Sequence, residues 1–351
     1  MTSWPWAREF APETTYLNTA SMGLPPARTT AALSESLERW RLGRAQAADY
    51  DAVVEECRRA YATLLGVDAR TVAIGSQASA MAGLVAASLP GSARVLVAAG
   101  DFTSVTFPFF AQAPRGIDVR EVPLDRLADA VEPGVALVAV SAVQSADGAL
   151  LDLDRLRRAC RAVGAEILLD LTQAAGWWRG DVTDVAYTVC SGYKWLLAPR
   201  GTGYLTVRAD LTDAVVPHQA GWFAGEDRWS SIYGAPLRLA ADARRFDVSP
   251  AWHSWVGAAA SLEVLAEIGP AARHSHATGL AARFCAGLGV AHDGSAIVSV
   301  TVDDDGVAAL AAADVVVAAR AGRTRFSFYV NNTEADVDRA LDVLDGHVLP
   351  D

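Results

Sequence analysis

One lysine of this 351-residue chain lies where it could act as a nucleophile. Lys194 stands between the apolar residues 186–190, which predict a short buried strand, and the glycine-rich residues 200–207, which predict a turn leading into another strand. A lysine shielded from water has a lowered pKa and can attack a carbonyl carbon to form a Schiff base. An arbitrary lysine is more often a solvated loop residue. The chain, however, is rich in arginine and very poor in lysine, so its composition does not explain this one.

A carboxylate upstream of Lys194 could serve the same site. Asp170 follows residues 167–169, an apolar run that fits a parallel strand buried on both faces. Ligands of open α/β sheets collect at this edge, and an aspartate there can keep a pyridine nitrogen protonated. Gln173, three residues further along, can reach the same place. Taken alone, Asp170 is equally well explained as a helix N-cap. A strand with Asp-x-x-Gln, followed by a strand with Ser-Gly-Tyr-Lys, favours a cofactor site.

These residues resemble the class V aminotransferase family, which binds pyridoxal 5′-phosphate (PLP) in the fold-type I architecture and includes the cysteine desulfurases. The resemblance extends from residues 16–20 to residues 332–334. It implies an α/β fold with a mostly parallel central sheet, helices on both faces and a small α+β C-terminal domain. It also implies that Lys194 holds PLP as an aldimine, and that the sites form at the interface of a homodimer.

The start of one predicted helix is a candidate phosphate site. Residues 71–75 predict a strand that runs into a turn of small residues, and a helix N-terminus offers unpaired N–H groups to an anion. The resemblance assigns this role to Ala78 and Ser79, although the chain has Gln77 where the family usually has glycine. An ordinary serine cap would give the same pattern.

Three further residues match family positions that contact the phosphate. The family commonly has Ser-x-His-Lys, and the chain keeps Ser191 but has Tyr193 in place of histidine. A tyrosine hydroxyl can still donate a hydrogen bond to a phosphate oxygen. Ser249 is expected to contact the phosphate of the other subunit. A proline-terminated loop before a helix at 251–268 explains Ser249 equally well.

Two more residues match positions that contact the ring and the substrate. Phe102 stands where desulfurases have a histidine that stacks on the cofactor; phenylalanine can stack but cannot exchange a proton. Core packing is the alternative for Phe102. Arg325 matches a C-terminal Arg-x-Ser motif whose arginine binds the substrate's α-carboxylate, for which a planar guanidinium is suited. A surface arginine paired with an acid is the alternative.

Length and composition agree with a large two-domain enzyme. The hydrophobic content of 52% predicts a large core, and we expect an arm at 1–30, a PLP-binding domain at 31–250 and a linking helix with a small domain at 251–351. The net charge of -11 argues against nucleic acid and anionic membranes as partners. The four cysteines are scattered without metal-ligand spacing, and no signal peptide or membrane span is apparent, so we expect a cytoplasmic, bacterial protein.

Strands and helices are predicted to alternate through the large domain, as in a mostly parallel sheet covered on both faces. Residues 28–64 predict two helices, and core packing is the favoured interpretation of their aromatic residues, Trp40 and Tyr61. The remaining predicted strands are 94–99, 117–122, 135–140, 296–300 and 324–328.

The reaction is less constrained than the cofactor. Desulfurases carry a cysteine on a loop shortly before the carboxylate-binding arginine, and residues 306–322 contain none. The first hypothesis is therefore a lyase that acts on an amino acid by β-elimination, cleaving the carbon–sulfur bond of a cysteine conjugate or sulfoxide, as in the branch that includes the ergothioneine-pathway lyase. The second is an aminotransferase or an isopenicillin N epimerase-like racemase that acts at Cα. A noncatalytic binding protein is disfavoured because Lys194, Asp170 and Arg325 are all retained.

Overall fold

A computed structural model describes residues 4–350. Residues 1–3 of the expected arm and Asp351 of the expected small domain lie outside the described residues. Within the described part, no helix is long and apolar enough to cross a membrane. Nor do residues 4–350 contain a group of three or more His, Cys, Asp or Glu side chains that could hold a metal ion.

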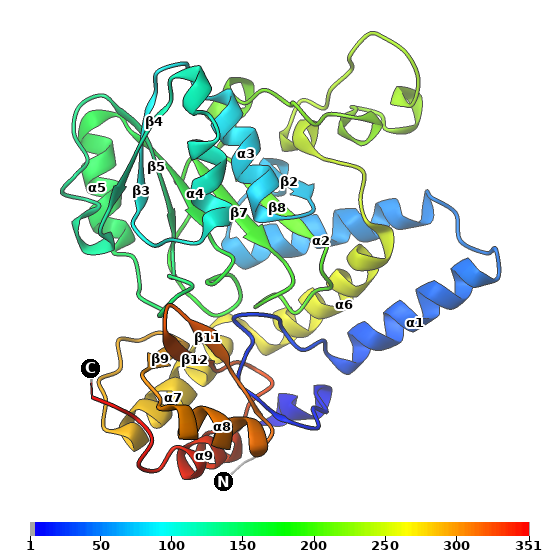
Figure 1. Ribbon diagram of the computed structural model, residues 1–351. Coiled ribbons are helices and arrows are strands. Elements are labelled where there is room, and N and C mark those ends of the chain that lie inside the picture. Colours follow the sequence, from blue (N-terminus) through cyan, green and yellow to red (C-terminus); the bar gives the residue numbers. More distant parts are fainter. Residues whose placement is uncertain (1–3, 351) are drawn as a thin grey trace.

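A seven-stranded sheet forms the centre of the large domain (Figure 1). Its order is β2-β8-β7-β6-β5-β3-β4, and all neighbours are parallel except β8, which is antiparallel to β2 and β7. The strands are β2 (Val72–Gly75), β3 (Arg94–Ala98), β4 (Asp118–Val122), β5 (Val135–Ser141), β6 (Glu166–Asp170), β7 (Tyr187–Ser191) and β8 (Gly203–Val207). The mostly parallel α/β fold predicted from the sequence is confirmed.

Helices cover both faces of this sheet (Figure 1). They are α2 (Asp49–Leu65), α3 (Ala78–Ser88), α4 (Thr103–Phe110), α5 (Leu153–Val163) and α6 (Trp252–Ile268), whereas α1 (Ala27–Arg41) packs against α6 and extends away from the sheet. Alternate strand residues enter two separate cores, because side chains along a strand point to opposite faces. Leu96 and Leu169 pack in the core formed with α2, α5 and α6, whereas Val97 and Leu168 pack in the core formed with α3 and α4.

The small domain has its own apolar core, to which both ends of the chain contribute. It contains α7 (Pro270–Leu288), β9 (Ile297–Val300), α8 (Asp304–Ala312), β10 (Val315–Val316), β11 (Ala318–Arg320), β12 (Arg323–Ser327) and α9 (Glu334–Val343). Strand β1 (Thr15–Tyr16), from the N-terminal segment, pairs in parallel with β10, and Leu17 is fully buried in this core.

The N-terminal segment also lies directly on the loop that carries Lys194. The Gly23 N–H donates to the Tyr193 carbonyl at 2.9 Å. A Cβ at position 23 would lie 2.1 Å from the Lys194 carbonyl oxygen, so only glycine allows this approach. Residues 15–23 therefore connect the small domain to the lysine loop.

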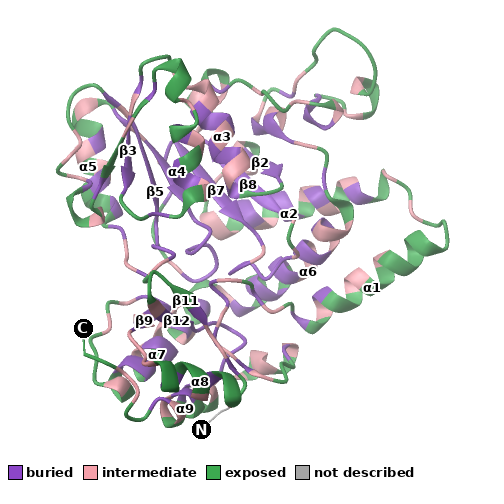
Figure 2. Cartoon of the chain, in the orientation of Figure 1, coloured by how far each residue is buried: buried purple, intermediate pink, exposed green. Residues whose placement is uncertain are grey.

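One prediction about the first two helices is wrong. Tyr61 is fully buried, as expected, but the Trp40 side chain is 63% exposed and does not belong to the core. Helix α1 packs against α6 near its start, where Thr29 and Ser261 are hydrogen-bonded, and is exposed along most of its remaining length (Figure 2). The regularly spaced apolar residues of this helix thus do not all face a core. Trp40 lies on an exposed face and contacts the His253 ring there.

Candidate active site

Most of the predicted site residues line one pocket at the ends of β5, β6 and β7, beside the start of α3. Its cavity volume is about 20 Å³. Among the predicted residues it includes Ala78, Phe102, Asp170, Gln173, Ser191, Tyr193 and Lys194. Strands β6 and β7 are parallel neighbours, so the residues at their C-terminal ends meet at one edge of the sheet.

Lys194 is the only lysine in the sequence, and its side chain is 4% exposed. No described residue accepts a hydrogen bond from its Nζ, which lies 5.1 Å from the centre of the Phe102 ring. Burial lowers the pKa of Lys194 to about 8, while the charge of Asp170 opposes this change. Within the described chain, Lys194 is thus a buried amine without a polar partner, poised to be neutral near physiological pH.

The loop that follows Lys194 is tightly held. The Leu197 N–H donates to the Lys194 carbonyl at 3.0 Å, and the Ala198 N–H donates to the Gly192 carbonyl at 3.1 Å. Leu197 has a φ of 57°, in the left-handed region that leucine rarely adopts. The Leu197 carbonyl accepts a hydrogen bond from Ser261 in α6. The turn that orients Lys194 is therefore a strained segment fixed by its surroundings.

Asp170 ends β6 and is 3% exposed. Its Oδ1 accepts a hydrogen bond from the Thr172 N–H at 2.7 Å, but within residues 4–350 it forms no ion pair. Burial raises the pKa of Asp170 to about 6, although the hydrogen bond from Thr172 and the charge of Lys194 act in the opposite direction. A buried carboxylate facing a pocket without a bound cation is suited to receive a cationic N–H from a ligand.

Gln173 supports the floor of the pocket rather than presenting a free amide. Its Nε2 donates to the Ala20 carbonyl and to the Ser145 hydroxyl, both at 3.0 Å. Its Oε1 accepts a hydrogen bond from the Trp195 indole at 2.7 Å. Gln173 therefore joins the N-terminal segment, the loop after β5 and the lysine loop around one buried side chain.

The start of α3 lies against the lysine strand. The Ala78 N–H donates to the Ser191 hydroxyl at 3.0 Å, and the Ser191 N–H donates to the Thr172 hydroxyl at 3.0 Å. Gln77 caps the helix without a side-chain hydrogen bond. Ser79, the second helical residue, is half-buried but does not line the pocket. The helix N-terminus that was predicted to hold phosphate is thus present beside Ser191.

Phe102 and Tyr193 both place an aromatic ring near the lysine amine. The Phe102 ring is 42% exposed and belongs to no core, in agreement with a surface that faces a ligand. The Tyr193 ring contacts the Arg200 guanidinium at 5.0 Å and the Lys194 Nζ at 5.8 Å. Because Arg200 lies beside the predicted phosphate contact, it is a cation that the sequence analysis missed.

Arg325 is a buried arginine, 1% exposed, without a carboxylate partner in the described chain. Its Nη1 donates to the Ser145 carbonyl and hydroxyl, and its Nη2 donates to the Ser21 hydroxyl at 2.8 Å. Its Nε is buried without a hydrogen-bond partner. Burial lowers the pKa of Arg325 to about 10, and the charge of Arg320 adds to this effect. A buried cation with an unused donor is suited to an anionic ligand.

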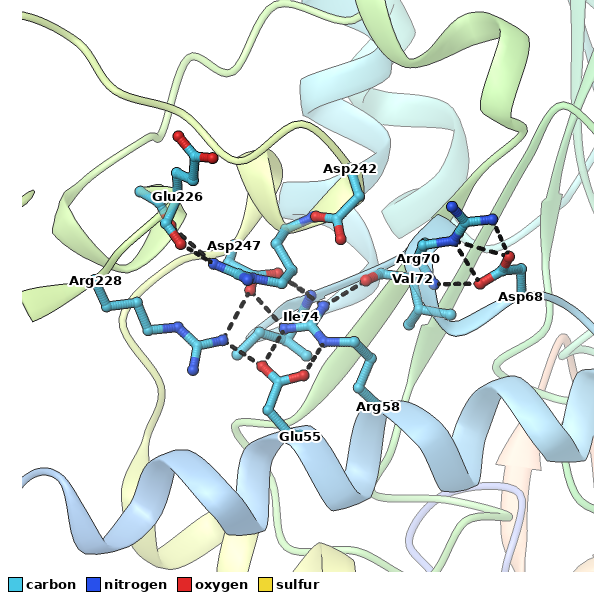
Figure 3. Close-up of polar contacts among 12 residues, drawn as sticks. Glu55, Arg58, Asp68, Arg70, Val72, Ile74, Glu226, Arg228, Asp242 and Asp247 are labelled. Carbon is cyan, nitrogen blue, oxygen red and sulfur yellow. Dashed lines mark hydrogen bonds and ion pairs between the residues drawn. The ribbon is translucent and has the colours of Figure 1, made fainter.

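Ser249 is exposed and does not line the pocket of its own chain. It follows Asp247, which is fully buried and ion-paired with Arg58 of α2 (Figure 3). The Asp247 carboxylate also accepts a hydrogen bond from the Ile74 N–H at 2.8 Å, and Arg228 and Glu55 complete the cluster. This cluster fixes the loop before α6 against β2, near the start of α3. The role of Ser249 toward a second subunit stays a prediction.

Other polar residues of the pocket were not singled out from the sequence. Thr172 follows Asp170 closely, and Ser141 directly follows the predicted strand at 135–140. Their positions in the chain could therefore have marked both as candidate pocket residues. Ser141 binds Asp101, whose carboxylate accepts hydrogen bonds from the Ser141 N–H and hydroxyl at 2.7 and 2.6 Å. Ser104 is another, whereas Ser145 lies after the predicted strand at 135–140, where the family resemblance already places polar residues that face the cofactor or the substrate.

Comparison with known proteins agrees with this arrangement. The family model described as Aminotransferase class-V matches residues 16–315. The isopenicillin N epimerase of Streptomyces clavuligerus is 29% identical over 249 residues, 63% of this chain and 61% of that protein. The cysteine desulfurase of Frankia sp. (strain EuIK1) is 30% identical over 226 residues, 56% of this chain and 54% of that protein. The matched part thus spans less than two thirds of the length of these curated relatives.

A solved structure matches over a larger part of the chain. The cystine C–S lyase C-DES, in complex with its reaction product cysteine persulfide, superposes with a TM-score of 0.86 at 22% identity. The match covers 95% of this chain and 98% of that chain. At this level of identity, the likeness establishes the fold.

Proposed function

The chain belongs to the class V aminotransferase family, which uses PLP, and we propose that it is a PLP-dependent lyase. The proposed reaction is β-elimination with cleavage of the carbon–sulfur bond of a cysteine conjugate or cysteine sulfoxide. The substrate, the reaction type, a homodimeric assembly and a cytoplasmic location are all parts of this proposal. The likeness to the ergothioneine-pathway lyase also stays a prediction.

The pocket residues fit PLP. Asp170 is a buried carboxylate without a cation, Lys194 is a buried amine without a hydrogen-bond partner, and both line the same pocket. These are the two groups that a pyridinium N–H and an aldehyde require. The start of α3 adds backbone N–H groups for a phosphate at the same edge of the sheet.

Each predicted contact then has a definite task. Asp170 would hold the ring nitrogen protonated, Phe102 would cover one face of the ring, and Lys194 would hold the aldehyde carbon. The phosphate would lie at Ala78, Ser79, Ser191 and Tyr193. Arg325 would bind the α-carboxylate of the substrate through its free Nε and the neighbouring Nη2.

The chain's own residues can carry out an elimination. Bound PLP withdraws electrons from Cα of the substrate and so makes its proton acidic. Lys194 would accept this proton at Nζ, as its lowered pKa favours the neutral amine. The electrons of the Cα–H bond form a Cα–Cβ double bond, and the electron pair of the Cβ–S bond leaves with sulfur. Water then converts the released aminoacrylate to pyruvate and ammonia.

The observation that carries the proposal is the set of proton-transfer groups around Lys194. The pocket-lining residues of the described chain include neither a cysteine nor a histidine. The Phe102 ring, whose centre lies 5.1 Å from the Lys194 Nζ, cannot return a proton. All four cysteines are buried, and burial raises the pKa of each thiol, so none is suited to accept sulfur as a thiolate. A site in which Lys194 acts as the single base suits elimination better than persulfide formation, which needs a thiolate, or epimerisation by two bases.

The second candidate is an aminotransferase or an epimerase acting at Cα. Lys194 alone could both remove a proton and return it elsewhere, and the relative from S. clavuligerus is an isopenicillin N epimerase. The two candidates differ in their products, because only elimination breaks the bond to Cβ.

The test is an assay of the purified protein with PLP and S-substituted cysteines, their sulfoxides and ordinary amino acids. We expect pyruvate and ammonia in equal amounts from a cysteine derivative, and Lys194→Ala is expected to lose both this turnover and the visible absorbance of the bound cofactor. Conversion of the cofactor to its amine form, or inversion at Cα without pyruvate, would replace the lyase by the second candidate. Visible absorbance retained by Lys194→Ala with bound PLP would contradict the assignment of the lysine.

A further inference from the structure

The hairpin formed by β11 and β12 carries three arginines on one face. It lies on the side of the small domain that faces the large domain (Figure 1). Arg320 is paired with Arg323, and Ala318 with Arg325, and such cross-strand pairs share a face of the sheet. The turn consists of Ala321 and Gly322, with φ of 47° and 77°, as in the tight two-residue turns of β-hairpins. Arg320 is therefore held at the end of its strand, close to Arg325.

Arg320 and Arg325 converge on one hydroxyl group. The Ser21 Oγ accepts hydrogen bonds from Arg325 Nη2 at 2.8 Å and from Arg320 Nη2 at 3.3 Å. Within residues 4–350, neither guanidinium forms an ion pair with a carboxylate. Both charges act on Lys194, whose pKa they help to lower, so both lie close to the site.

Ser21 is fixed in place by the N-terminal segment. Its N–H donates to the Asn18 carbonyl at 2.9 Å, and the neighbouring Ala20 N–H donates to the Ser327 hydroxyl at 3.0 Å. Since its oxygen accepts from two arginines, the Ser21 hydroxyl proton remains to be donated elsewhere. Two guanidinium groups thus meet at one hydroxyl, whose own proton can be donated to a further acceptor.

The arrangement is unfavourable without an anion. Arg320 and Arg325 are like charges a few residues apart, and Arg325 is buried, so their repulsion is only partly screened by water. One α-carboxylate would satisfy the free Nε of Arg325. Arg320 donates from Nη1 to the Ala319 carbonyl and from Nη2 to Ser21, but it would still have no carboxylate partner, and its planar guanidinium is suited to bind a second one.

We propose that Arg320 and Ser21 bind a second carboxylate of the substrate, beside the α-carboxylate bound by Arg325. This inference rests on the proposed function and narrows it: the substrate is a cysteine derivative whose sulfur substituent carries a carboxylate. Arg320 then selects among substrates, whereas Arg325 serves every amino acid that enters the site.

The experiment compares S-(2-carboxyethyl)cysteine with the neutral S-propylcysteine, by the ratio of their kcat/KM values for pyruvate release. We expect the wild type to prefer the carboxylate, and Arg320→Gln to lower the ratio by about tenfold or more, as for the loss of a charged hydrogen-bonded pair. Arg320→Lys is expected to keep part of the preference. Arg323 is paired with Arg320 across the hairpin, so Arg323→Gln removes a charge of the same kind and is the matched control. The ratio of kcat/KM values should not change in this variant. An Arg320→Gln ratio equal to that of the wild type would overturn the inference, as would an equal loss in Arg323→Gln.

Calorimetry separates this inference from the proposed reaction. Glutarate and butyrate differ by one carboxylate and bind without any chemistry, so their affinities can be compared in the wild type and in Arg320→Gln. A preference for glutarate that is lost in Arg320→Gln, in a protein that releases no pyruvate, would support the second carboxylate site while rejecting the lyase. Equal affinities for the two acids in the wild type would reject the site whatever the reaction.

Discussion

Replacing Lys194 by methionine is expected to stabilise the cofactor-free protein at neutral pH. The buried amine has a pKa of about 8 instead of the ordinary 10.5, because burial disfavours its charged form. Since one pKa unit corresponds to about 1.4 kcal/mol, protonated Lys194 costs the folded state about 3 kcal/mol. Its side chain is 4% exposed, so solvent screening reduces this figure little. Methionine keeps most of the apolar length without the charge.

The sign and the pH range of the effect follow from the two pKa values. Below pH 8 the lysine is protonated in both the folded and the unfolded chain, so the whole cost is present. Between about pH 8 and 10.5 the folded protein has released the proton and the unfolded chain has not, so the cost shrinks as pH rises. Above 10.5 both forms are neutral and the cost is gone.

Urea unfolding of both proteins without PLP, followed by tryptophan fluorescence at pH 7 and near pH 10.5, measures the difference. The variant should be more stable by about 3 kcal/mol at pH 7 and by much less at the higher pH. Equal or lower stability of the variant at pH 7 would refute the reasoning. A gain that persists at the higher pH would assign it to packing rather than to charge. With PLP present, the wild type should gain more stability than the variant, because ligand binding favours the folded state.

Three further predictions concern Lys194, Asp170 and the cluster of Figure 3. Because Lys194 is the sole lysine, lysine labelled with ¹³C at Cε should give one NMR signal in the cofactor-free protein, with a midpoint near pH 8. Asp170→Asn should move this midpoint lower, since the Asp170 charge raises the pKa of the amine; a midpoint near 10 in the wild type would contradict the burial. Asp170→Asn should also weaken PLP binding by about tenfold or more in an equilibrium titration, because the cofactor ring loses its charged hydrogen-bond partner. Asp247→Asn should destabilise the protein by roughly 3 kcal/mol in urea unfolding, since it removes the fully buried carboxylate partner of Arg58 and leaves only Glu55, which is partly exposed. Replacing both by apolar residues, Arg58→Met with Asp247→Leu, should cost less; a greater loss would show that the pair itself is strongly stabilising.

The sheet and the two central site residues could be predicted because their signals are local. Continuous apolar runs of strand length, each followed by a polar residue, placed Asp170 and Lys194 at neighbouring strand ends. The same alternation located the strands of the large domain to within one or two residues. The antiparallel direction of β8 could not be read from its composition, which resembles that of its parallel neighbours.

The rest of the site depends on contacts between distant segments. Ser21 meets Arg325 across most of the chain length, and neither residue carries a sequence signal for the other. Trp40 was assigned to a core because apolar spacing shows only that a helix has an apolar face, not what covers that face. Gln173 was expected to reach the site of Asp170, and it lines that pocket, but its three hydrogen bonds to Ala20, Ser145 and Trp195 could not be read from the sequence.

The pairing of β1 with β10 has a consequence for synthesis on the ribosome. Residues 15–23 are translated before the large domain, yet their partners on β10 and β12 are translated only after it. The large sheet can form while residues 15–23 are still unpaired, and the small domain forms after it. Ser21 therefore reaches the arginine hairpin only after β11 and β12 have been translated.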